Sequence, residues 1–187
     1  MDLVARAKGI LTAPRAEWPV IAGESTGTAE LYAGYVAPLA AITPVASILG
    51  NLLFNGGLSF SASVVFGVIA FAMALASVYV LGLIASKIAP SFGGKDDLAQ
   101  GLKLVAYGYT ASWVAGIFSL IPALALISTI GGLYSLYILY TGTSVMMGVP
   151  QERSAAYTAV VILVAIGLYI VIATILGAVI AAGSLAR

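Results

Sequence analysis

One uncharged stretch of the sequence, from Leu31 to Ser86, decides the fold: LYAGYVAPLAAITPVASILGNLLFNGGLSFSASVVFGVIAFAMALASVYVLGLIAS. A helix that crosses the hydrocarbon core of a bilayer needs about 20 mostly apolar residues, so this stretch has room for two. The sequence Asn55-Gly56-Gly57 near its middle is typical of a turn. The stretch therefore predicts two membrane-spanning helices, at about residues 31–54 and 60–86.

The composition of the whole chain agrees with a membrane protein. Of 187 residues, 8% are charged and 61% are hydrophobic, and the mean hydropathy is +1.10. A soluble domain carries about 25% charged residues, so a water-soluble globular protein is excluded. The chain has no His and no Cys, which removes disulfides, thiol nucleophiles, His-based catalytic triads and most metal sites. A net charge of +1 gives no reason to expect binding to nucleic acid.

A second uncharged stretch, from Leu104 to Gln151, is too long for a single membrane-spanning helix. Pro122 divides it, because proline disfavours helix in the residue that precedes it. The division gives spans at about residues 104–121 and 123–147, and a further apolar run gives a fifth span at about residues 155–182. We therefore expect an all-α, polytopic membrane protein. Residues 1–30 would form a cytoplasmic or interfacial N-terminal segment, and residues 31–187 a bundle of five transmembrane helices.

The charged residues separate onto one side of the five predicted spans. Seven of the eight Lys and Arg residues, and all seven Asp and Glu residues, fall in the N-terminal segment or in the second and fourth loops. Arg187 alone falls on the other side. Loops rich in Lys and Arg remain in the cytoplasm, so we expect a cytoplasmic N-terminus and a C-terminus outside.

The N-terminal segment has the pattern of a short amphipathic helix. Its apolar residues recur at helical spacing around two basic residues, Arg6 and Lys8; they are Leu3, Val4, Ala7, Ile10 and Leu11. Such a helix lies in the membrane interface, where Trp18 would anchor it at the depth of the lipid headgroups. The alternative is a helix that packs beneath the bundle and contacts protein. The segment lacks the continuous apolar run of a cleavable signal peptide.

No charged residue lies within a predicted span. Charged residues inside the membrane are the usual mark of proton relays, ion sites and coupled transport. We therefore expect neither a proton-driven pump nor a carrier of charged substrates. The chain also has no constellation of catalytic or metal-binding residues and no cofactor motif, which predicts a protein that is not an enzyme. Hydroxyl groups and backbone carbonyls could still line a pore.

Four hydroxyl side chains share one face of the predicted fourth span: Tyr134, Tyr137, Thr141 and Ser144, at spacings of three, four and three residues. Exposing these hydroxyls to lipid is unfavourable, so we expect this face to point into the bundle. Hydrogen bonding between helices is the favoured interpretation, and a solvated cavity is the alternative.

Small residues recur at every fourth position in two predicted spans. The third span carries Gly108, Ser112 and Gly116, and the fifth carries Ala173, Gly177 and Ala181. Such faces let helices approach closely. We expect them to pack within the bundle, although a contact between two copies of the chain would use the same pattern. Trp113, near the middle of the third span, should find an acceptor for its indole N–H within the bundle.

Several short motifs occur in order along nearly the whole chain. They are Ile10-Leu11-Thr12-Ala13-Pro14 with Glu17-Trp18, Tyr35-Val36-Ala37-Pro38-Leu39-Ala40, Tyr107-Gly108-Tyr109, Gly132-Leu133-Tyr134-Ser135-Leu136-Tyr137, Tyr140-Thr141-Gly142 and Met147-Gly148-Val149-Pro150. With these motifs the sequence resembles the bacterial form of the Yip (Ypt-interacting protein) domain family. The resemblance implies five membrane helices with a cytoplasmic N-terminus, here in a bacterial inner membrane, and it carries over no catalytic residues.

Eukaryotic proteins of that family are associated with small Rab-type GTPases and vesicle traffic. This sequence departs from them, because its N-terminal segment is short and no proline closely follows Tyr109. The resemblance therefore does not extend to GTPase binding.

These features together are most typical of a non-enzymatic membrane protein that organises partners or lipids through its bundle and its cytoplasmic face. One alternative is a pathway for a small neutral solute, an ion or a lipid, which the hydroxyl face of the fourth span suggests. Another is an accessory subunit of a larger membrane complex. The expected partners are membrane lipids, with a second copy of the chain or another membrane subunit as further candidates.

Overall fold

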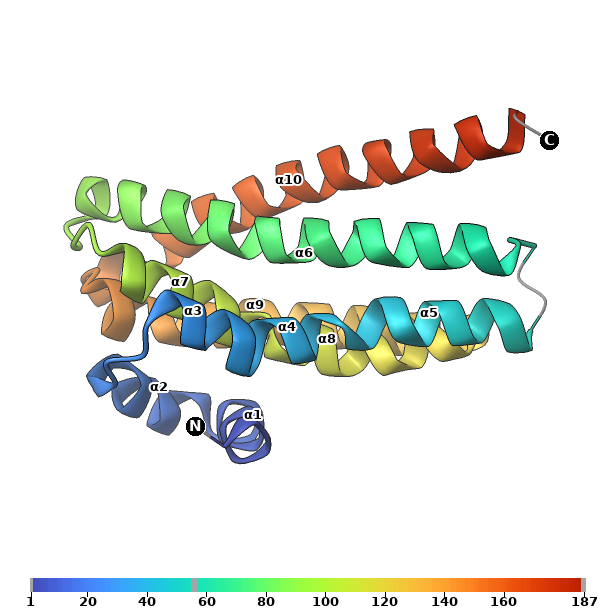
Figure 1. The fold of residues 1–187 in the computed structure, drawn as a ribbon. Coiled ribbons are helices and arrows are strands. Elements are labelled where there is room, and N and C mark those ends of the chain that lie inside the picture. The colour runs from blue at the N-terminus through green and yellow to red at the C-terminus, as the bar shows by residue number, and fades with distance from the viewer. Residues whose placement is uncertain (1, 55–56, 186–187) are drawn as a thin grey trace.

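The computed structural model describes residues 2–54 and 57–185, which form helices joined by short connections and contain no strand. Long helical segments lie side by side in a bundle, and a pair of short helices lies against one end of it (Figure 1). The connections that follow α6 and α9 lie at that same end (Figure 1).

The two short helices are α1 (Leu3–Thr12) and α2 (Pro14–Gly23). Asp2 begins α1, because its carboxylate accepts hydrogen bonds from the backbone N–H groups of Val4 (2.9 Å) and Ala5 (3.2 Å). Pro14 occupies the first position of α2, where its missing N–H costs nothing. The predicted amphipathic segment is therefore helical and forms a helical hairpin with α2.

The first long segment contains α3 (Thr28–Leu31), a π-helical turn (Tyr32–Val36), α4 (Ala37–Ala40) and α5 (Ile42–Leu53). Pro38 and Pro44 explain why it is not one regular helix. Each lacks the N–H that would bond to the carbonyl four residues earlier, so the hydrogen-bond pattern loosens before Pro38 and breaks at Ala41.

The second long segment is α6 (Phe60–Ile88), which continues into a 3-10 turn at Ala89–Phe92. Ser59 begins α6, since its hydroxyl accepts a hydrogen bond from the N–H of Ala62 (3.3 Å). Gly93 ends the segment with φ = +83°, a left-handed conformation that favours glycine.

The third segment begins before the span predicted from the sequence. It contains α7 (Leu98–Gly108), α8 (Thr110–Ala115) and a 3-10 turn (Gly116–Leu120), so its helix begins at Leu98 rather than at Leu104. The carboxylate of Asp97 accepts a hydrogen bond from the N–H of Gln100 (3.0 Å) and so fixes the earlier start. The chain then turns through Pro122–Leu124 into α9 (Ala125–Met147), and α10 (Gln151–Leu185) follows.

Three helices within the described residues are long and apolar enough to cross a membrane: Thr28–Leu53, Phe60–Phe92 and Gln151–Ala178. Among the described residues, α9 and the broken segment α7–α8 are not in this set. Both nevertheless run alongside the others in the bundle (Figure 1). The chain is thus an all-helical membrane protein.

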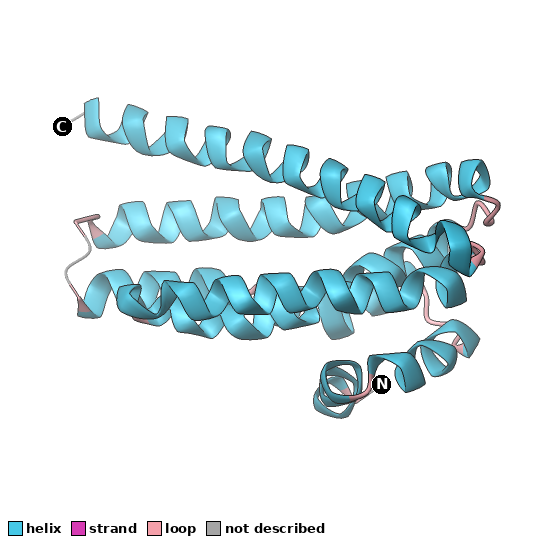
Figure 2. Ribbon diagram, turned by 180° about the vertical axis from the view of Figure 1, so that it is seen from behind, coloured by secondary structure: helices cyan, strands magenta, loops and turns pink. Residues whose placement is uncertain are grey.

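The best-packed part of the molecule is the half of the bundle next to α2. Trp18, Tyr35, Tyr107 and Tyr157 are all fully buried there. The other half leaves many large apolar side chains exposed, and α10 diverges from α6 toward the C-terminal end (Figure 2). Exposed apolar side chains on membrane helices are expected to face lipid.

Candidate functional site

Trp18 docks α2 onto α9. Its side chain is fully buried, and its indole N–H donates to the carbonyl of Ile138 (3.2 Å) and to the hydroxyl of Thr141 (3.1 Å). Gly142 makes room for the ring, because an added Cβ would lie within 2.8 Å of three of its carbon atoms. The expectation that Trp18 anchors in the lipid headgroups is therefore corrected: its ring contacts protein, as in the alternative of a helix packed against the bundle.

Arg6 joins α1 to α2. It is 9% exposed, and its two terminal nitrogens donate to the carboxylates of Glu17 and Glu24. Gly9 allows this approach, since an added Cβ would lie 2.6 Å from Glu17 Cδ. Arg6 was expected to face the membrane interface, but it pairs inside the protein with two carboxylates, that of Glu17 in α2 and that of Glu24 directly after α2. Lys8 is exposed, so its role as an interfacial anchor stays a prediction.

Polar side chains of α7 hold the C-terminal end of α2. The Lys103 ammonium donates to the carbonyls of Ile21 (3.4 Å) and Glu24, and the Gln100 amide donates to the carbonyl of Ala22 (3.2 Å). Carbonyls at a helix C-terminus lack helical partners and attract cations. Sequence reasoning missed this contact because it assigned Lys103 to a loop.

The four hydroxyl residues of α9 have different surroundings. The Tyr134 hydroxyl donates to the carbonyl of Leu11 in α1 (2.8 Å), Thr141 accepts from Trp18, and Ser144 shares a hydrogen bond with Ser154 of α10 (2.7 Å). Tyr137 is 41% exposed and stacks on Tyr134, with 5.7 Å between ring centroids. Three of the four hydroxyls are thus used in contacts between helices.

The small residues of the third segment lie at close contacts. An added Cβ on Gly108 would lie 2.9 Å from Leu139 Cδ1, and one on Gly116 would collide with Thr43 of α5. The backbone N–H of Ser112 donates to the Ser135 hydroxyl of α9 (2.9 Å). This set therefore faces two different helices, α9 and α5.

The small residues of α10 have no such neighbours in the described part of the chain. Ala173 is exposed, and an added Cβ on Gly177 would meet no heavy atom within 4 Å. The side chain of Ala181 lies outside the described residues. The expected packing of this face within the bundle is therefore not seen at Ala173 or Gly177.

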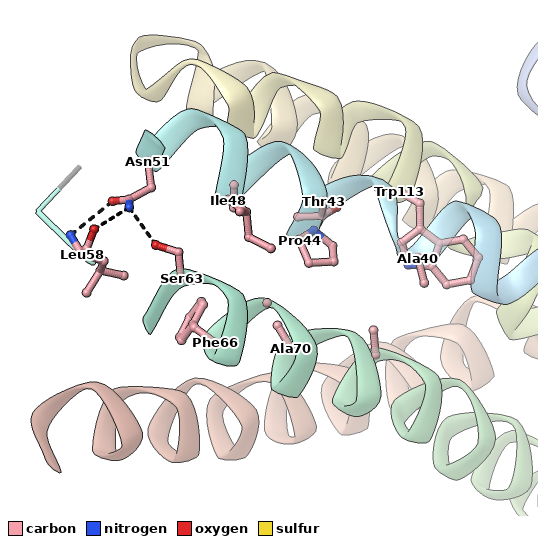
Figure 3. A pocket seen from close by; sticks show the side chains of 13 residues that line it. Ala40, Thr43, Pro44, Ile48, Asn51, Leu58, Ser63, Phe66, Ala70 and Trp113 are labelled. Atoms are coloured by element: carbon pink, nitrogen blue, oxygen red, sulfur yellow. Dashed lines mark hydrogen bonds between the residues drawn. The ribbon is translucent and has the colours of Figure 1, made fainter. Parts of the chain in front are cut away.

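Two adjoining cavities surround Trp113. One, of about 340 Å³, lies between α5 and α6, and it extends from Asn51 at one end to Ala40 at the other (Figure 3). The second, of about 320 Å³, lies between α6, α8 and α10. Both are partly open to the outside. Four residues line both cavities: Thr43, Ala70, Ala74 and Trp113.

Trp113 itself is 7% exposed and stacks on Tyr109, with 5.9 Å between ring centroids. Its indole N–H has no hydrogen-bond acceptor in the described part of the chain, contrary to the expectation from the sequence. The cavities were also not predicted from the sequence. Pro44 and Asn51 in the first predicted span could have indicated them, because they are typical of an irregular helix with a polar end.

The arrangement can hold helices together and can accept an apolar molecule beside Trp113. Within the described residues, no group of three or more acidic side chains is placed to hold a metal ion.

Comparison with known proteins identifies the family of the chain. The chain is 24% identical over 161 residues to the inner membrane protein YohC of Escherichia coli (strain K12), covering 80% of this chain and 83% of YohC. The same values hold for YohC of Escherichia coli O6:H1. No solved structure matches the chain. The model of the Yip1 domain matches residues 8–181, and the chain therefore belongs to the Yip1 domain family.

Proposed function

We propose that this protein is a non-enzymatic scaffold of the bacterial inner membrane that organises lipids or partner proteins. It would cross the membrane five times, with its N-terminus in the cytoplasm and its C-terminus outside. The name of its relative YohC supports the inner membrane, and the one-sided distribution of charge supports the orientation.

The proposal rests on the hydrogen bonds that the hydroxyl groups of α9 form with other helices. A pathway for solutes or ions needs polar groups that face a passage. Tyr134, Thr141 and Ser144 instead bond to α1, α2 and α10. These contacts favour a molecule in which the polar face of α9 holds the N-terminal helices in place.

The docked helices present a charged surface at one end of the bundle. Asp2, Lys8 and Arg15 are exposed on α1 and α2, and Lys95 and Asp97 are exposed on the nearby loop. A partner that recognises charge would approach this end, because in the proposed orientation it faces the cytoplasm.

Reconstitution into vesicles tests the proposal against a transport function. Purified protein should give no flux of glycerol, potassium ions or fluorescent phospholipid above that of empty vesicles. Protein extracted in native lipid discs should retain a partner, or a lipid enriched over the bulk membrane, by mass spectrometry. Flux that falls in Tyr137→Phe and Thr141→Val would contradict the proposal, as would the absence of any retained partner or enriched lipid.

A further inference from the structure

We infer that the two cavities around Trp113, together called the Trp113 crevice, bind one acyl chain of a phospholipid. The lipid would come from the leaflet next to Asn51, at the end of the bundle opposite α2. This inference rests on the proposed function, since it names a lipid that the scaffold would hold, but it is tested by a separate measurement.

The crevice is too large to remain empty without a loss of packing. Its two parts have volumes of about 340 and 320 Å³ and share four lining residues. Binding pockets for small molecules have volumes of about 300–1,000 Å³. Leaving such a space empty would cost the lining atoms their dispersion contacts, and water is not stabilised by walls that are mostly apolar.

The length of the first cavity, the one between α5 and α6, fits one leaflet. Ala40 and Asn51 line its two ends and lie on the same helical segment, eleven residues apart, which corresponds to about 16 Å (Figure 3). One leaflet contributes about 15 Å to the hydrocarbon core of a bilayer. A chain that enters at Asn51 would therefore reach Trp113 and Ala40, where the second cavity continues along α6 as far as Leu81.

The polarity of the two ends gives the direction of the lipid. At one end, the Asn51 amide donates to the carbonyl of Leu58 (2.9 Å) and to the hydroxyl of Ser63 (2.7 Å) (Figure 3). This polar cluster lies next to the α5–α6 turn, where the ester groups of a phospholipid would lie. Beyond it the walls become apolar, with Ile48, Pro44 and Ala70 along the crevice.

Trp113 lies on the wall that the two cavities share. Its side chain is 7% exposed, so part of the ring faces space that the described chain does not fill. An acyl chain in the crevice would contact the apolar ring, and the ring therefore reports on what occupies the crevice.

Fluorescence quenching by brominated lipid tests the inference, because the chain has only two tryptophans. Trp18→Phe leaves Trp113 as the single emitter, and Trp113→Phe leaves Trp18, which is enclosed by protein. Each variant is reconstituted in vesicles of phosphatidylglycerol, with or without bromine on the acyl chains. Bromine should reduce the emission of Trp113 far more than that of Trp18.

Substitutions in the crevice make the test specific. In the Trp18→Phe background, Ala70→Leu fills the space shared by both cavities and should reduce the quenching. Ala72→Leu is the matched control, because Ala72 is exposed on the outer face of the same helix. Ile48→Ala enlarges the crevice and should increase the quenching, so the inference remains testable if Ala70→Leu does not fold.

Three results would overturn the inference: equal quenching of Trp18 and Trp113, quenching that neither Ala70→Leu nor Ile48→Ala changes, or occupation of the crevice by a second copy of the chain in crosslinking. If quenching fails while the wild-type protein retains a partner and shows no flux, only the crevice inference is lost. If flux appears while quenching responds as expected, the scaffold function is lost instead.

Discussion

Gly142 is the residue on which the position of Trp18 depends most directly. The indole ring lies so close to its backbone that a methyl group cannot fit without movement of the ring. The same ring meets Tyr107 edge to face, with 6.5 Å between centroids, so Trp18 connects α2 to both α9 and α7. A small change at Gly142 therefore affects three helices.

Gly142→Ala should destabilise the docked N-terminal helices by about 1–3 kcal/mol, the cost of overpacking a filled site. It should also shift the emission of Trp18 to longer wavelength in a Trp113→Phe background. Gly167→Ala is the control, because an added Cβ there meets nothing within 4 Å and alanine favours a helix by about 0.5–1 kcal/mol. Equal unfolding free energies for the two variants in denaturant would contradict the close contact.

Asp96 gives a prediction for the loop between α6 and α7. The Lys87 ammonium donates to its carboxylate (2.7 Å), as does the Ser86 hydroxyl, and these bonds hold the pKa of Asp96 below its ordinary value of 3.8. The folded loop favours the ionised carboxylate. Its contribution to stability is therefore complete above the ordinary pKa and is lost as the pH falls through the lowered value.

The carboxyl carbon of Asp96, followed by NMR across an acid titration, should show a midpoint below 3.8. Lys87→Met should raise that pKa, because the charge-assisted hydrogen bond is removed. Lys95→Met serves as the control, since Lys95 is exposed and forms no ion pair with the described residues. A midpoint that Lys87→Met leaves unchanged would count against the contact.

At the scale of elements, α1 and α2 behave as one unit because Arg6 bonds to two carboxylates of the following segment. Arg6→Met should leave Glu17 and Glu24 close together without their partner. The loss of charged hydrogen bonds predicts a destabilisation of the hairpin by about 1–3 kcal/mol. Backbone amides of α1 should then exchange with deuterium faster, while those of α6 keep their protection.

Arg15→Met is the matched control for this experiment, because Arg15 is exposed on the same hairpin and forms no ion pair with the described residues. Exchange in α1 that increases equally in both variants would show that Arg6 does not join the helices.

The helical pattern of α1 could be predicted from the sequence, but its environment could not. Periodicity identifies which residues share a face and does not identify what covers them. Arg6 was assigned to the lipid interface because its partners Glu17 and Glu24 belong to a later part of the hairpin. Lys103 was assigned to a loop for the same reason, since the carbonyls that satisfy it come from α2.

The break in the third segment could also not be predicted from the sequence. Tyr109 and Gly116 are compatible with a continuous helix, and the close approach of Thr43 of α5 to Gly116, where the 3-10 turn begins, is a contact between distant parts of the chain. The hydroxyl face of α9 could be predicted from the sequence. The hydrogen-bond partners of Tyr134 and Thr141 could not, because they lie more than a hundred residues away along the chain. Spacing along one helix carries no information on such distant contacts.

At the scale of the whole molecule, the separation of charge gives the sharpest prediction. The chain has no cysteine, so single cysteines report topology directly. Lys95→Cys should react with an impermeant maleimide only in opened cells, and Ser61→Cys should react in intact cells. Ser61 is exposed at the start of α6, and Lys95 is exposed in the loop that follows the other end of this segment. The reverse pattern would invert the proposed orientation, and labelling of both from one side would change the number of spans.

The docking of Trp18 has a consequence for the order of events during synthesis. Its hydrogen-bond acceptors, Ile138 and Thr141, lie 120 and 123 residues further along the chain. At about 5–20 residues per second, the ribosome needs about 6 to 24 seconds to reach them after it has made Trp18. Gln100, Lys103 and Tyr107 of α7 are made earlier, so α2 can first pack on α7. The indole N–H of Trp18 gains its two acceptors only once α9 has been inserted.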